Sequence, residues 1–240
     1  MFSNYFEDIS KELKTKLKKR LSIASQSSQA EAKESEHELY KDLFLFFKEH
    51  FPEGLHVGPG KIRGKSHLLP KEVDCIFYKK WSNKLIEMCS GWHLIDYVIG
   101  IMSVERKLST QALVNHINLS QAIKTLYAKT FNIKDNDYIP LCSFLWAYDN
   151  TIPLLSHQKA IYDAQEEKKV PFNCEMDMVV ILDKGIILKD WENGKFKVIE
   201  TGKDSMMWGY IIMMEYLGLD RSIPFSARDF IKRTEDYVEY

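Results

Sequence analysis

Apolar residues recur at spacings of three and four along two stretches near the N-terminus, and this spacing predicts two amphipathic helices. The first spans residues 2 to about 21 and the second about 36–51, where Pro52 ends it because proline cannot continue a helix. The residues between them, 22–35, are small and polar without periodicity, so we interpret them as a linker or an exposed helix end.

Two apolar, β-prone stretches with acidic residues set into them follow these helices. The first is centred on residues 73–78 and contains Asp74, and the second runs from about residue 97 to 107. Side chains alternate between the two faces of a strand, so we expect Glu105 and Lys107 to share a face. An acid in an apolar strand is costly unless it is paired or bound to a cation. We therefore expect Asp74, Glu105 and Lys107 to converge on one point.

The rest of the chain alternates between helical and strand-like periods. Gly58, Pro59 and Gly60 interrupt an earlier strand, and we interpret them as a turn or bulge in it. The later elements that we expect are a helix at about 110–130, a strand at 140–148, a helix near 153–168, a hairpin over 177–189, a strand at 195–200, a helix from 205 to about Gly218 and a polar helix over 225–240. This order predicts an α/β fold, a three-layer-like sandwich with a central mixed β-sheet, over residues 36–240. An N-terminal helical arm, residues 1–35, precedes it.

Composition and charge exclude several classes of protein. The 240 residues include 33 basic and 34 acidic side chains, so the formal net charge is 33 − 34 = −1 and no global field attracts nucleic acid. The four cysteines are widely spaced without a C-x-x-C pair, so we expect buried thiols rather than disulfides or a zinc site. No apolar run approaches the ~20 residues of a membrane helix, and MFSNYFEDIS lacks the basic start and apolar core of a signal peptide. We therefore expect a cytoplasmic protein without a membrane segment.

The aspartate Asp74, followed by Glu105-x-Lys107 on the next strand, resembles the motif of the PD-(D/E)XK nuclease superfamily. The resemblance extends to a bacterial nuclease-like domain of unknown function from defence and restriction contexts. In that pattern a helix ending in an apolar–Pro step, a glycine-containing strand, the aspartate strand, the second strand and a long helix follow one another, as they do here from about Glu36 to Lys129. The resemblance implies a restriction-endonuclease-like core and a metal-dependent nuclease that acts on DNA in bacterial restriction or anti-phage defence.

The same resemblance implies roles for individual residues. Asp74 and Glu105 would hold Mg²⁺ or Mn²⁺, hard cations that prefer oxygen ligands, and Lys107 would be the catalytic cation. Nuclease-like folds of this superfamily often add an acid from the first helix, and Glu36, on the apolar stripe of the second predicted helix, is the candidate third ligand. The alternative interpretation is a surface acid that the helix dipole favours at a helix start.

A second register of the motif is also open. Counted without a gap from Asp96, the acidic and lysine positions of the family pattern fall on Ser103 and Glu105, and that register has lost both residue types. Glu105 and Lys107 lie two residues later on the same predicted face. The gapless register predicts a catalytically degenerate, nuclease-like scaffold that acts as an interaction or regulatory subunit with a partner protein. The later register predicts an active enzyme.

Contacts with nucleic acid must come from local basic clusters, because the net charge is near zero. Lys61, Arg63 and Lys65 follow the glycine-containing turn and are candidates for binding a phosphate backbone. The first helix carries six basic residues between positions 11 and 20, and the choice there lies between a solvated face, a phosphate contact and a partner surface.

Overall fold

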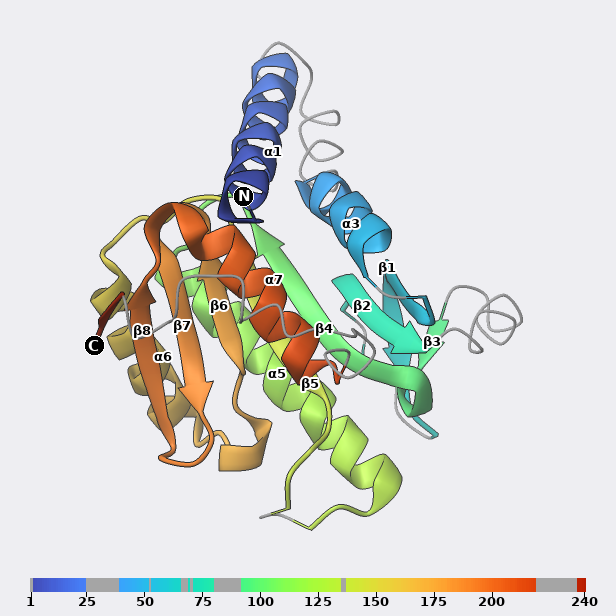
Figure 1. The fold of residues 1–240 in the computed structure, drawn as a ribbon. Coiled ribbons are helices and arrows are strands. Elements are labelled where there is room, and N and C mark those ends of the chain that lie inside the picture. The colour runs from blue at the N-terminus through green and yellow to red at the C-terminus, as the bar shows by residue number, and fades with distance from the viewer. Residues whose placement is uncertain are drawn as a thin grey trace.

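The computed structural model describes residues 2–24, 39–51, 53–65, 69, 71–79, 92–134, 137–218 and 237–240. They form an α/β fold in which a nine-stranded mixed sheet lies between two layers of helices (Figure 1). The strand order is β3-β1-β2-β4-β5-β6-β7-β8-β9. The predicted sandwich around a central mixed sheet is confirmed.

The sheet brings the start of β2 and the end of β4 to one edge. β4, β5 and β6 run parallel to one another, whereas β2 runs antiparallel to β4. The strands are β1 (Leu55–Arg63), β2 (Val73–Lys79), β3 (Trp92–Leu94), β4 (Val98–Glu105), β5 (Cys142–Ala147), β6 (Met178–Ile181), β7 (Gly185–Asp190), β8 (Lys195–Glu200) and β9 (Val238–Glu239). The helices are α1 (Phe2–Ala24), α3 (Leu39–His50), α5 (Thr110–Phe131), α6 (Leu154–Lys168) and α7 (Ser205–Tyr216), with 3-10 turns η2 (Ile95–Tyr97), η3 (Phe172–Cys174) and η4 (Gly202–Asp204).

Alternation of side chains directs the two faces of the central strands into different cores. Cys75 and Met102 face a core covered by α1, α3 and α7, whereas their neighbours Ile76 and Ile101 face α5. α6 continues the second layer of helices over β5 and β6. β5 is buried at every position, as expected for a parallel strand with helices on both faces.

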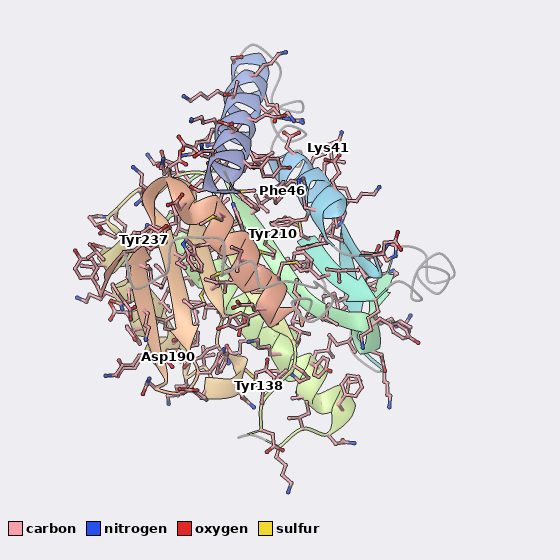
Figure 2. The ribbon with its side chains drawn as sticks, in the orientation of Figure 1. Lys41, Phe46, Tyr138, Asp190, Tyr210 and Tyr237 are labelled. Atoms are coloured by element: carbon pink, nitrogen blue, oxygen red, sulfur yellow. The ribbon has the colours of Figure 1, made fainter. Side chains whose placement is uncertain are left out.

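α7 packs closely against the sheet because Gly209 faces it. A Cβ atom at this position would lie 2.8 Å from Val180 Cγ2 and 2.9 Å from Trp146 Cη2, so a larger residue would force the helix away. α7 is apolar on nearly all sides, which is typical of a helix buried between other elements. Figure 2 shows Tyr210 of α7 beside Phe46 of α3, with ring centroids 5.7 Å apart.

The predicted N-terminal helix, α1, packs against the core that α3 and α7 also cover. Phe6, Leu13 and Leu17 of α1 belong to the same buried cluster as the apolar residues of α3 and α7. Arg20 donates to both carboxylate oxygens of Asp42 in α3, each at 3.0 Å, which is a bidentate ion pair. α1 therefore stands in a fixed position above the sheet (Figure 1). Residue 35, the predicted end of the arm, lies outside the described residues.

Several local predictions are confirmed. The register between β1 and β2 shifts between Gly58 and Gly60, which is the predicted bulge. The second predicted helix is present as α3, and the later strands and helices fall within a few residues of their predicted bounds. Three of the cysteines are buried free thiols, whereas Cys89 lies outside the described residues. Within the described part of the chain, no helix is both long and apolar enough to cross a membrane.

Three expectations differ from the structure. β4 ends at Glu105 rather than at Lys107, because its pairing with β5 stops at the Glu105–Ala147 pair. β3 was not predicted, and it forms by pairing with β1. The polar helix expected over 225–240 is wrong at its end, where β9 pairs with the exposed edge of β8. The start of that helix lies outside the described residues.

Candidate functional site

Asp74 lies in β2, and the backbone of β4 holds its carboxylate. Its Oδ2 accepts a hydrogen bond from the Val104 N–H at 2.8 Å. Continuing the register of the β2–β4 pair by one residue places Asp74 opposite Ser103, and opposite residues of antiparallel strands point to the same face. Ser103 and Glu105 share that face because side chains alternate along a strand. The structure therefore brings Asp74 and Glu105 to one face of two adjacent strands.

Arg106 and Lys107 form a short exposed bend that leaves the sheet after β4, which we call the Arg106–Lys107 excursion, and they do not continue the strand. The backbone on both sides of this excursion is hydrogen-bonded to the end of β5, so its position is fixed. The two bonds run from the Tyr148 N–H to the Glu105 carbonyl at 3.0 Å and from the Leu108 N–H to the Asp149 carbonyl at 2.8 Å. Strand alternation therefore no longer sets the direction of the Lys107 side chain.

A buried histidine on α5 joins β4 to β5 beneath the acidic residues. His116 is 2% exposed, its Nδ1 lies 2.9 Å from Ser103 Oγ and its Nε2 lies 3.0 Å from Ser143 Oγ. Burial, together with the positive charges of Lys71 and Lys124, lowers the pKa of His116 to about 3. A neutral imidazole has one N–H, so one serine accepts a hydrogen bond from the ring and the other donates one to it.

A buried ion pair continues this polar network. Asp177 Oδ2 accepts hydrogen bonds from Lys124 Nζ at 2.9 Å and from the Ser143 N–H at 2.7 Å, and Trp191 Nε1 donates to Oδ1 at 3.1 Å. Burial raises the pKa of Asp177, and the Lys124 ammonium opposes that shift. Because Ser143 also contacts His116, polar contacts run without a break from β4 to the loop that carries Trp191.

Sequence reasoning missed this network, although one signal was present. Lys124 falls on the apolar stripe of α5, in line with Leu113 and Ile117, where a lysine is costly unless it is paired. Its partner Asp177 precedes a strand far away in the chain, so no local pattern connects the two residues.

The predicted phosphate contacts Lys61, Arg63 and Lys65 lie at the end of β1 and directly after it. A Cβ atom on Gly64, between them, would lie 2.7 Å from Leu126 Cδ1, so this segment packs against the C-terminal half of α5. Gly60, the residue before Lys61, is paired with Val73, the residue before Asp74, so Lys61 lies near the start of β2 and the acidic pair. The contact of Lys61, Arg63 and Lys65 with nucleic acid stays a prediction.

The donor set at this edge fits a hard divalent cation. Asp74 and Glu105 supply carboxylate oxygens from adjacent strands, and Mg²⁺ commonly binds through one or two carboxylates with water completing its shell. Glu36, the predicted third acid, lies outside the described residues. Among the residues that are described, no cluster of three or more His, Cys, Asp and Glu side chains could hold a metal ion.

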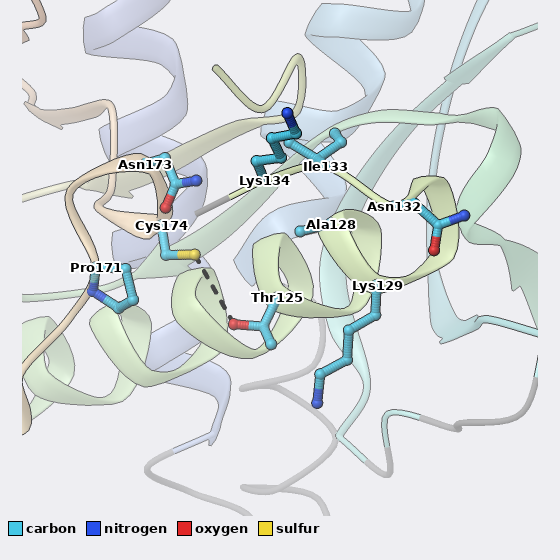
Figure 3. A pocket seen from close by; sticks show the side chains of 9 residues that line it. All are labelled: Thr125, Ala128, Lys129, Asn132, Ile133, Lys134, Pro171, Asn173 and Cys174. Carbon is cyan, nitrogen blue, oxygen red and sulfur yellow. Dashed lines mark hydrogen bonds between the residues drawn. The ribbon is translucent and has the colours of Figure 1, made fainter. Parts of the chain in front are cut away.

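The surface of the described structure is hollowed at the end of β4 and at the C-terminal end of α5. A groove of about 500 Å³ lies at the end of β4, between α1, the Arg106–Lys107 excursion and the β6–β7 turn. A pocket of about 430 Å³ lies at the C-terminal end of α5, where Thr125 Oγ1 is 3.8 Å from Cys174 Sγ (Figure 3). No carboxylate lines this second pocket, whereas the groove is lined by Arg106 and Lys107, which directly follow Glu105 in the chain.

The fold matches solved structures of NucC. The cAAA-bound form from E. coli MS115-1 has a TM-score of 0.66 at 11% identity, covering 91% of this chain and 91% of that chain. The cAAA-bound form from P. aeruginosa ATCC27853 has a TM-score of 0.63 at 9% identity, with 91% and 92% covered. The apo form of the E. coli protein has a TM-score of 0.58 at 11% identity, with 85% and 97% covered. No family model and no curated protein matches the sequence. At these identities the likeness shows the fold, and this chain has the restriction-endonuclease-like fold of NucC.

Proposed function

We propose that this chain is a metal-dependent nuclease that hydrolyses phosphodiester bonds of DNA in anti-phage defence. The observation that carries the proposal is the placement of Asp74 and Glu105 on one face of adjacent strands, in a fold shared with an endonuclease of phage defence. Hydrolysis of a phosphodiester by metal-activated water needs a divalent cation at such a pair of carboxylates.

In this proposal the residues of the chain would hold the metal ion and stabilise the charge that develops on the scissile phosphate. Asp74 and Glu105 would hold Mg²⁺ or Mn²⁺, and the bond from Val104 fixes the direction of the Asp74 carboxylate. A bound divalent cation supplies positive charge against the scissile phosphate and lowers the pKa of water. Lys107 would stabilise the negative charge that develops in the transition state, and the fixed backbone on both sides of it limits the cost of ordering it.

A degenerate scaffold is the second candidate, and one observation favours it. Ser103, the acidic position in the gapless register, is hydrogen-bonded to the buried His116 and cannot serve as a carboxylate ligand. In this register Glu105 stands where the lysine belongs, and no cation steadies the nucleophile. The chain would then act as an interaction or regulatory subunit.

Cleavage of plasmid and single-stranded DNA tests the choice between them. Purified protein is assayed with EDTA, Mg²⁺ or Mn²⁺, each with and without cAAA, because two of the similar structures are named as cAAA-bound forms. The nuclease proposal expects cleavage that needs the metal and is lost in Glu105→Gln. Wild-type protein that binds no metal at millimolar concentration by calorimetry, or cleavage that survives Glu105→Gln, would refute it.

A further inference from the structure

We propose that the groove at the end of β4 binds the sugar–phosphate backbone of the nucleic acid substrate away from the scissile bond. This inference rests on the proposed nuclease function. The groove is connected to the candidate site through the chain, because Arg106 and Lys107 line it and directly follow Glu105.

The groove concentrates positive charge in a chain whose net charge is −1. Its lining includes the basic residues Lys14, Lys18, Arg106, Lys107 and Lys184. It also includes two acids, so its formal charge is 5 − 2 = +3. A positive cleft in a near-neutral protein focuses the local field and attracts a polyanion.

Four of the five basic side chains are available to a ligand. Lys14 is the exception, because its Nζ forms an ion pair with Asp183 Oδ2 at 2.7 Å. Asp183 also accepts a hydrogen bond from Ser10 Oγ at 2.8 Å. The other four basic side chains are exposed, and none of them forms an ion pair with another residue that the structure describes.

The walls of the groove are fixed before any ligand binds. α1 is tied to α3 by the bidentate Arg20–Asp42 pair, and Lys14 Nζ also donates to the Leu182 carbonyl at 3.1 Å. The β6–β7 turn is held by a hydrogen bond from the Asp183 N–H to Ser205 Oγ at 2.7 Å. The backbone that carries these cations need not be ordered on binding, so only their side chains lose freedom when a phosphate binds.

The lining favours nucleic acid over an acidic protein. Protein interfaces usually bury an apolar or aromatic centre. The apolar lining residues of this groove, Leu17 and Tyr148, are only 9% and 2% exposed, so they offer little surface to a partner. A phosphate backbone needs only spaced cations, and this groove presents them on α1, on the excursion after β4 and on the β6–β7 turn.

The test measures binding rather than cleavage, so that its failure differs from failure of the nuclease proposal. In a Glu105→Gln background, the affinity for a fluorescein-labelled DNA duplex is measured by anisotropy between about 50 and 200 mM salt. The groove variant is Lys18→Glu/Lys184→Glu, which changes two exposed residues and leaves Lys107 intact. The matched control is Lys129→Glu/Lys134→Glu, which makes the same change in charge at the pocket of Figure 3.

We expect the groove variant to raise the Kd at least about tenfold at the lower salt and to reduce the salt slope by about 2, since each neutralised phosphate contributes about 0.9. The control variant should change both quantities much less. Equal losses in the two variants, or no loss in the groove variant, would overturn the proposal. Loss of binding to poly-glutamate together with unchanged DNA binding would assign the groove to an acidic protein and would overturn it as well.

Discussion

The carboxylate of Asp74 accepts a hydrogen bond from the backbone N–H of Val104, with 2.8 Å between Oδ2 and the nitrogen. One side chain therefore has two roles in this fold, because it joins β2 to β4 and supplies an acid to the candidate metal site. Hydrogen bonding stabilises the charged form of a carboxylate, which is the form that binds a cation.

Two substitutions at Asp74 separate these roles. Asp74→Asn keeps an oxygen that can accept from Val104 but removes the charge, so the free energy of unfolding should stay within about 0.5 kcal/mol of wild type while Mg²⁺ affinity falls. Asp74→Ala removes both, and should cost about 1 kcal/mol more. Urea unfolding and calorimetric Mg²⁺ titration measure the two effects. Equal stability of the two variants would contradict the structural role.

Substitution of Lys107 distinguishes the two registers of the motif. If Glu105 and Lys107 are the working pair, Lys107→Ala should keep metal binding but lose the cleavage rate, because the lysine acts on charge that develops in the transition state. Glu105→Ala should lose both. Arg106→Ala is the control, and at saturating DNA its rate should stay near wild type. Full activity of Lys107→Ala would leave the later register without support.

The buried pair of Lys124 and Asp177 should be sensitive to loss of one partner. Asp177→Asn leaves the Lys124 ammonium buried without its counter-charge, so the free energy of unfolding should fall by about 3–5 kcal/mol. Lys124→Met/Asp177→Asn removes both charges and should cost less than Asp177→Asn alone. Urea denaturation at neutral pH of both single variants and the double variant gives the coupling energy. A double variant less stable than Asp177→Asn would contradict the expectation.

Acid should destabilise the protein through His157. This residue of α6 is fully buried, and within the described structure neither of its ring nitrogens has a hydrogen-bond partner. Burial lowers the pKa of His157 to about 4, below its ordinary value of 6.5. Between these pH values the unfolded chain binds a proton that the folded chain does not, so stability falls as the pH falls from 6.5 towards 4 and is unaffected above 6.5.

The variant His157→Leu isolates this contribution. It should remove about 1.4 kcal/mol per pH unit from the slope of unfolding free energy in that window. A slope should persist, because His116 is also buried in its neutral form with its pKa lowered to about 3. Urea denaturation at several pH values from 4 to 7.5 measures the slope, and an unchanged slope in the variant would rule out His157 as its source.

The sequence by itself determined the features that depend on neighbouring residues. Apolar spacing predicted α1, α3, α5 and the central strands, and the Gly58–Gly60 stretch predicted the bulge in β1. Alternation along each strand set which neighbours share a face with Asp74 and with Glu105, whereas the pairing of β2 with β4 decided that the two acids point to the same face. These predictions succeed because helices and strands have fixed periods that show in any short window of sequence.

Only the tertiary structure decided the features that depend on residues far apart in the chain. It placed β9 on the edge of β8, ended β4 at Glu105 where its pairing stops, and brought Lys124 to Asp177. It also assembled the groove from α1, the residues after β4 and the β6–β7 turn, whose charges look like separate solvated patches in the sequence. Such contacts leave no local period, because their free energy comes from pairing and burial that exist only once the sheet has closed.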